Sequence, residues 1–152
     1  MTQIKTPDLA LMPLNPKSEF PEGFKLLGGG EVEETYRSRR EDLLLIRRHP
    51  EKATKVGADS PAGWLASFHG DLLFMQRCSF YPKAEYPDGG CNIEIYTNPD
   101  PLKYVELELL SPIHRPKKGE SFAFDISWQL YKLPHIPRDD EERIRIVRKI
   151  ME

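Results

Sequence analysis

The sequence is poor in features that would place it in several common functional classes. It contains two cysteines in 152 residues, too few for a disulfide framework and too few for a zinc site without histidine ligands. No apolar run approaches the roughly 20 residues that cross a bilayer, and no apolar stretch of the kind found in secretory signals follows the first residue. We therefore expect a cytoplasmic protein with no membrane partner.

An excess of charge of one sign is also missing. Lysine and arginine number 22 against 24 aspartates and glutamates, whereas nucleic-acid binders carry a basic excess, so we expect no nucleic-acid partner. The four histidines are far apart, and none has the His-x-x-x-His spacing of a helical metal site. No Gly-x-Ser-x-Gly elbow occurs, and the Gly28–Gly30 run lacks the lysine of a phosphate-binding loop. These absences predict neither a metal nor a cofactor.

The two cysteines, Cys78 and Cys91, both lie in apolar segments. Free cysteine is among the residues most often buried, which favours two inert thiols. A single Cys78–Cys91 disulfide is the alternative that the sequence leaves open.

Proline, in contrast, is abundant. Fourteen prolines, about twice the average share, divide the chain into short segments and favour strands over long helices. Residues 1–35 contain four of them, end near Gly28–Gly30 and show no periodicity, so we expect an irregular N-terminal arm there. Residues 36–134 should form the main domain.

Within that domain the apolar residues recur with the period of β-strands. Residues 62–78 predict a β-hairpin that turns at Gly70-Asp71. Three further segments alternate between apolar and polar residues, as strands with one buried face do. Their predicted inward residues are Cys91, Ile93 and Ile95, then Val105, Leu107 and Leu109, and finally Phe122, Phe124, Ile126, Trp128 and Leu130. Six or seven such strands predict a mostly β fold, an antiparallel β-sandwich.

The C-terminal residues 135–152 change to a helical pattern. Asp139 and Glu142 have capping-box spacing, and Ile144, Val147 and Met151 recur at helical intervals. We expect an amphipathic α-helix over 139–151 that buries this stripe and packs on the same domain.

The candidate binding residues lie on one predicted strand. Asn92, Glu94 and Tyr96 should share its polar face, because successive side chains alternate. A carboxylate, an amide and a phenol are the groups with which proteins bind polyols. Arg77 is a further candidate contact for a sugar. Glu106 and Glu108 share another outward face, which is the usual pattern of a solvated sheet.

The same strand resembles the galactose mutarotase-like, or aldose 1-epimerase-like, superfamily. In that superfamily a strand-borne glutamate is followed by Pro-Asp five and six residues later, as Glu94 is followed by Pro99 and Asp100. The likeness continues in Lys117–Ser121 and in the strand ending at Trp128-Gln129-Leu130. A group of domains of unknown function carries three more of its motifs. These are Lys55-Val56-Gly57, Gly63-Trp64-Leu65 and the segment Tyr86–Asn92, so that the likeness covers about residues 36–131.

The resemblance implies a truncated supersandwich that binds a sugar or sugar phosphate. Glu94 would be the catalytic base, and Asn92, Tyr96 and Arg77 would contact the substrate. If the protein is an enzyme, it would be an isomerase of the aldose 1-epimerase type. The earlier half of the family, which supplies two histidines including the general acid, has no counterpart here, and Tyr96 replaces the usual glutamine.

A second hypothesis is a non-catalytic interaction or oligomerisation domain. In that case the N-terminal arm and the C-terminal helix would cover a sheet edge or build a homodimer.

Overall fold

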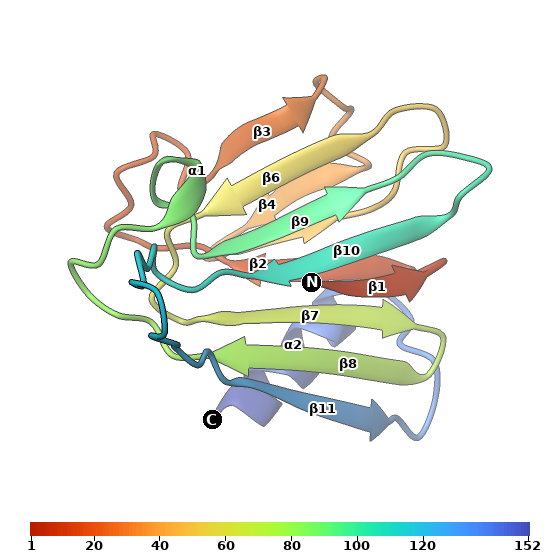
Figure 1. Cartoon of the computed structure of the whole chain (residues 1–152). Coiled ribbons are helices and arrows are strands. Elements are labelled where there is room, and N and C mark those ends of the chain that lie inside the picture. The colour runs from red at the N-terminus through yellow and green to blue at the C-terminus, as the bar shows by residue number, and fades with distance from the viewer.

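Two antiparallel sheets face each other in the computed structural model, which describes residues 1–152 (Figure 1). Sheet A has the strand order β1-β10-β9-β6-β3, and sheet B has the order β11-β8-β7-β2-β5-β4. The predicted mostly β antiparallel sandwich is confirmed. The strands are β1 (Thr2–Lys5), β2 (Leu9–Pro13), β3 (Lys25–Gly29), β4 (Arg37–Arg40), β5 (Leu43–Ile46), β6 (Thr54–Ala58), β7 (Trp64–His69), β8 (Leu72–Cys78), β9 (Ile93–Thr97), β10 (Tyr104–Leu109) and β11 (Ile126–Lys132).

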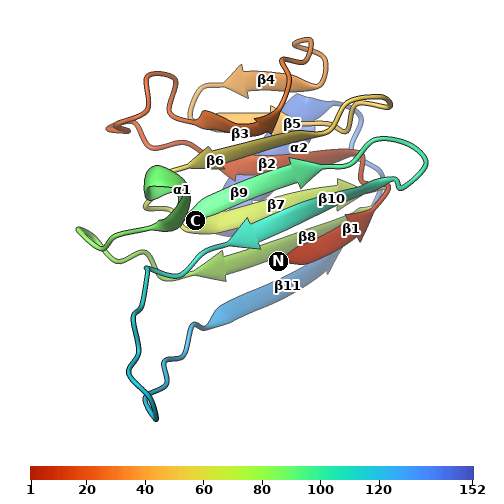
Figure 2. The same cartoon turned by 45° about the horizontal axis from the view of Figure 1, so that its top comes forward.

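Two apolar clusters hold the layers together. The first fills the space between the sheets and includes Ile93, Ile95, Val105 and Leu107 from sheet A. The second lies on the opposite side of sheet B, under the C-terminal helix α2 (Asp140–Met151). Figure 1 shows this helix behind β7 and β8, and the turned view of Figure 2 shows it behind β2 and β5, so that it lies on the side of sheet B away from sheet A. The central strands of sheet B are therefore covered on both faces, and sheet A is covered on one.

The predicted hairpin is confirmed, and so are the inward residues of β10 and the inward Ile93 and Ile95 of β9. β7 and β8 pair from Trp64 with Arg77 to His69 with Leu72, and the chain turns at Gly70-Asp71. β10 alternates between half-buried and buried residues as predicted. The short turn α1 (Pro87–Gly90) precedes β9, with Asp88 and Gly89 in the left-handed region that glycine tolerates best.

Residues 1–35 differ from the expected irregular arm. They contain β1, β2 and β3, and β2 is a fully buried strand between β5 and β7. Because both faces of sheet B are covered, β2 (Leu9–Pro13) is apolar throughout and has no alternation to detect. The N-terminal residues belong to both sheets.

The expectation that residues 121–131 bury five apolar side chains is also corrected. The regular strand begins only at Ile126. Phe124 is half-buried against the core, whereas the other four are exposed, namely Phe122, Ile126, Trp128 and Leu130. Ile126 and Leu130 pair with the inward residues Cys78 and Phe74 of β8, so the predicted face is right. However, sheet A ends at β1 and does not reach β11 (Figure 1). The inward face of this strand therefore has no opposing layer.

The C-terminal helix agrees with its prediction. The Asp139 carboxylate accepts a hydrogen bond from the backbone N–H of Glu142 at 2.8 Å, as a capping residue does. Ile144 and Val147 are buried, and Met151 packs at the edge of the same cluster. Neither helix has the length and apolar character required to cross a membrane.

Candidate functional site

The most unusual side chain of the molecule is Glu94, on the outer face of sheet A. Its neighbours along β9, Ile93 and Ile95, enter the core between the sheets, so that alternation turns Glu94 outward. Nevertheless its exposed fraction is 0%. A carboxylate on an outer sheet face is ordinarily solvated, and a fully buried one loses its hydration. Burial of Glu94 thus requires compensation from its neighbours.

Lys55 provides that compensation from the adjacent strand. Lys55 Nζ lies 2.6 Å from Glu94 Oε2 and 3.3 Å from Oε2 of Glu108, so that one ammonium group bridges two carboxylates. Apart from this ion pair, no hydrogen-bond donor meets either oxygen of Glu94. The Glu94 carboxylate therefore has unused acceptor capacity in a dry environment.

Burial also changes the acidity of this group. Desolvation, opposed by Lys55 and reinforced by the nearby Asp88 carboxylate, raises the pKa of Glu94 to about 7. Desolvation lowers the pKa of Lys55, but its ion pairs with Glu94 and Glu108 outweigh this and raise it above its ordinary value. Close to neutral pH, Glu94 can accept or release a proton while Lys55 stays charged. A pKa near neutrality suits a proton acceptor in acid–base chemistry.

Two motifs of the sequence meet at this point. β6 pairs with β9 so that Gly57 lies opposite Glu94 and Lys55 opposite Tyr96. A Cβ at Gly57 would lie 2.5 Å from Cys91 Sγ, which is closer than atoms can approach. The glycine of the Lys55-Val56-Gly57 motif thus leaves room for the cysteine that follows the Pro87–Gly90 turn. The lysine of the same motif neutralises Glu94.

This arrangement corrects the prediction that Cys91 enters the core with Ile93 and Ile95. Cys91 precedes the regular strand β9, and its thiol lies over Gly57 on the outer side of sheet A. Both cysteines are free thiols. Burial raises the pKa of Cys78 to about 11 and that of Cys91 to about 12, which makes both poor nucleophiles.

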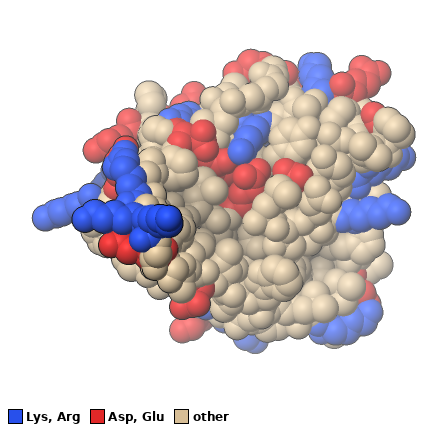
Figure 3. Space-filling model, viewed as in Figure 1, with Lys and Arg blue, Asp and Glu red and all other residues tan.

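Tyr96 and its neighbours extend the polar face beside Glu94. The Tyr96 hydroxyl donates to Asn98 Oδ1 at 2.8 Å, and its ring lies 6.2 Å from that of Tyr104 on β10. The Gln3 amide donates to Glu106 at 2.8 Å on the adjoining strand pair. Figure 3 shows acidic groups gathered at the middle of this face with basic groups beside them. The face thus combines aromatic rings, carboxylates and one bridging ammonium.

The other two predicted contact residues lie elsewhere. The buried amide of Asn92 donates to the backbone carbonyl of Ser60 at 2.7 Å and so ties the start of β9 to the β6–β7 connection. Arg77 Nη2 lies 3.0 Å from Met151 Sδ, on the side of sheet B that α2 covers. The structure therefore brings Tyr96 near Glu94 but places Arg77 on the opposite side of the sandwich.

Sequence analysis missed Lys55, Glu108 and Asp88 as members of the site. Lys55 was visible as part of a motif, but its contact with Glu94 depends on the pairing of β6 with β9, which are separated by more than thirty residues. The alternation in its strand predicts only that Glu108 lies on a solvated sheet face. It lies there, yet it shares the ammonium of Lys55.

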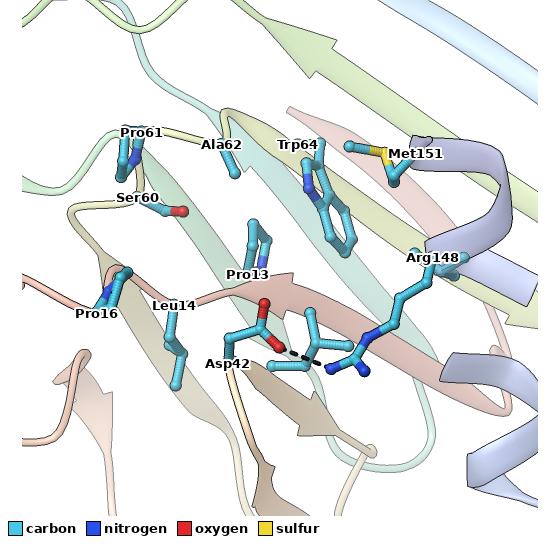
Figure 4. A pocket seen from close by; sticks show the side chains of 12 residues that line it. Pro13, Leu14, Pro16, Asp42, Ser60, Pro61, Ala62, Trp64, Arg148 and Met151 are labelled. Atoms are coloured by element: carbon cyan, nitrogen blue, oxygen red, sulfur yellow. Dashed lines mark hydrogen bonds and ion pairs between the residues drawn. The ribbon is translucent and has the colours of Figure 1, made fainter. Parts of the chain in front are cut away.

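A separate hollow of about 300 Å³ lies between the end of β2, the β6–β7 connection and α2 (Figure 4). Pro13, Pro61 and Trp64 form much of its wall, and the ion pair of Arg148 with Asp42 at 2.9 Å crosses one side. Ser60 points into it with a buried hydroxyl that has no hydrogen-bond partner. None of the larger hollows of the surface is lined by Glu94. The perturbed carboxylate and this hollow are thus distinct features.

Comparison with known proteins identifies no relative of this chain. No family model, no curated protein and no solved structure matches the chain.

Proposed function

We propose that this chain is a carbohydrate-binding β-sandwich of the mutarotase-like type, with its site on the outer face of sheet A around Glu94. The observation that carries the proposal is the buried Glu94 carboxylate, which retains a single ion pair and free acceptor capacity. An exposed glutamate would serve the stability of the sheet better, because it would keep its hydration. Retaining a buried one is typical of a site that uses it.

The surroundings of Glu94 suit a sugar ring. Glu94 and Glu108 can accept hydrogen bonds from hydroxyl groups, and Lys55 can donate them. The rings of Tyr96 and Tyr104 offer an apolar surface beside these charges. The Lys55 side chain is 29% exposed, and its flexible stem allows the ammonium to turn toward solvent. A sugar hydroxyl could then occupy its place beside Glu94.

Binding is favoured over isomerisation because Glu94 lacks a histidine acid. His69 Nδ1 lies 2.8 Å from the Thr6 carbonyl, and His135 Nε2 lies 2.9 Å from the Glu142 carboxylate. His49 Nδ1 accepts two backbone N–H groups, and His114 stacks on Phe122. All four histidines are thus engaged with groups outside the Glu94 cluster. Ring opening needs an acid and a base together.

Saturation-transfer NMR with glucose, galactose and their 6-phosphates tests the proposal. We expect wild-type protein to bind at least one of these ligands and Glu94→Gln to bind it about 10–100-fold more weakly, because a charged acceptor is lost. Glu141→Gln, at an exposed glutamate of α2 on the other side of the sandwich, is the control and should bind as wild type. Absence of binding to all four ligands, or equal binding by Glu94→Gln, would contradict the proposal.

Polarimetry on α-glucose and α-galactose separates binding from catalysis. We expect wild-type protein to leave the spontaneous rate of mutarotation unchanged. A wild-type acceleration that Glu94→Gln abolishes would show instead that Glu94 acts as a base.

A further inference from the structure

The four edge strands of the two sheets differ in how they are protected against pairing with another chain. β4 (Arg37–Arg40) contains three arginines, β3 (Lys25–Gly29) is interrupted by a bulge, and β1 (Thr2–Lys5) has four residues and ends in a lysine. Charges, bulges and shortness are the usual means by which proteins block edge-to-edge association. β11 (Ile126–Lys132) has seven residues and pairs with β8 without a bulge. It is the one long, regular edge.

β11 also carries an exposed apolar face. Trp128 is 64% and Leu130 68% exposed, although both lie on the face that elsewhere meets the core. Trp128 packs edge-on against Phe74 of β8, with ring centroids 5.8 Å apart. Figure 1 shows β8 and β11 beyond β1, the last strand of sheet A, and Figure 2 shows β11 at that edge. The sandwich thus lacks a layer over this strand.

Charge does not oppose the approach of another chain here. The single charged residue of β11 is Lys132, at its end, and it forms an ion pair with Asp71 of the same chain. The remaining residues, Ile126–Tyr131, are neutral. Figure 3 shows uncharged atoms covering most of the surface over β8 and β11.

The exposed apolar area at this edge is large enough to favour contact with another chain. An aromatic side chain offers about 150–250 Å² in full, so the exposed parts of four large side chains come to roughly 450 Å² per copy. In a pair of β11 strands, the parts of Ile126, Trp128 and Leu130 that face the partner strand would be buried, together with the backbone groups of the unpaired edge. The four side chains are Phe122, Ile126, Trp128 and Leu130.

We propose that β11 pairs antiparallel with β11 of a second copy of this chain, so that the two B sheets become continuous across a two-fold axis. An antiparallel edge is complementary to itself, as a closed two-fold dimer requires. With the axis near Gln129, Trp128 of one copy lies opposite Leu130 of the other, on the same face. The apolar side chains of the two copies then lie side by side across the new strand pair and remove part of one another's surface from water. This inference is independent of the sugar-binding proposal, which concerns sheet A.

Sedimentation velocity over a range of concentrations tests the dimer. Wild-type protein should have twice the mass of one chain, and Leu130→Lys and Trp128→Glu should each weaken association about tenfold or more by placing charge on the paired edge. Leu102→Lys, at an equally exposed leucine in the β9–β10 connection, is the matched control and should remain dimeric. Because all three side chains are exposed, circular dichroism should show native spectra.

Tryptophan fluorescence gives a second readout. The variant Trp64→Phe removes the buried indole and leaves Trp128 as the reporter. Its emission should shift to shorter wavelength as the dimer forms. A wild-type monomer at about 100 μM, a concentration at which even a weak micromolar dimer would form, would overturn the proposal. A dimer that persists in Leu130→Lys and Trp128→Glu, or an assembly larger than two, would also overturn it.

Discussion

The two sheets differ most in what covers their outer faces. The outer face of sheet B carries Trp64, Phe68 and Leu73 and is covered by α2. The outer face of sheet A carries Lys55, Glu94 and charged neighbours and has no helix over it. Removal of apolar area from water explains the covering of sheet B. It does not explain why sheet A buries a carboxylate, and the proposed sugar site is our account of that burial.

The burial patterns of individual strands reflect this difference between the sheets. In β7, five of six residues are buried, because the core lies on one side and α2 on the other. In β10, half-buried and buried residues alternate strictly, because only one side is covered. Continuous apolar strands therefore mark the sheet between two layers, and alternating strands mark the sheet with a free face.

The largest expected effect on stability comes from disrupting the packing of α2 on sheet B. Val147→Asp would place a carboxylate without a partner between α2 and the sheet, where Val147 is 1% exposed. We expect the free energy of unfolding to fall by about 3–5 kcal/mol, as for an uncompensated buried charge. Urea denaturation followed by far-UV circular dichroism measures it.

The matched control for that substitution is Arg145→Asp on the exposed side of the same helix. Its effect should stay within about 0.5 kcal/mol, as at most surface positions. Equal effects of the two substitutions would mean that α2 does not cover sheet B in solution.

A smaller effect is expected at Glu94, and its sign depends on pH. Burial raises the pKa of Glu94 from 4.5 to about 7. Between these values the folded state holds a proton that the unfolded state has released, so stability falls as the pH rises through this range and is level above it. The fall should amount to roughly 3 kcal/mol if the full shift is realised. Urea denaturation at pH 5, 6, 7 and 8 measures this dependence.

Glu94→Gln removes the titrating group, so this fall should disappear and the variant should exceed wild type in stability at pH 8. Glu106→Gln, on the same sheet face, should keep the pH dependence of wild type. If the free energy of unfolding changed with pH equally in wild type and in Glu94→Gln, the Glu94 carboxylate would be solvated. Sheet A would then not bury a charged group.

Local patterns predicted the parts of the fold that local physics determines. Alternation placed Val105, Leu107 and Leu109 in the core, and turn residues located the β7–β8 hairpin. The same reasoning missed β2, since a strand buried on both faces has no period to detect. The same reasoning also predicts that Trp128 is buried, whereas it is exposed. The residues of β11 do not reveal how far the opposing sheet extends.

The candidate site was predictable only in part for a related reason. Alternation turned Glu94 outward, and that orientation is what the structure has. Its burial, however, depends on Lys55, which the register of β6 against β9 brings within 2.6 Å. Cys91 does not follow the alternation, because the regular strand begins only at Ile93, after the Pro87–Gly90 turn. Long-range register is not readable from one segment at a time.

The smallest effect is expected at Asp139, the N-cap of the helix α2 that covers sheet B. Asp139 caps α2 through its hydrogen bond to the Glu142 N–H, and the adjacent Asp140 forms an ion pair with Arg47. Asp139→Ala should lower the free energy of unfolding by about 1 kcal/mol, since a helix N–H loses its acceptor. Asp139→Asn, which keeps a side-chain acceptor, should lose much less. Hydrogen exchange should show faster exchange in the first turn of α2 for Asp139→Ala, while the amides of β9 and β10 stay unchanged. Equal stability of the alanine and asparagine variants, or faster exchange in both sheets, would mean that the cap does not act on the helix alone.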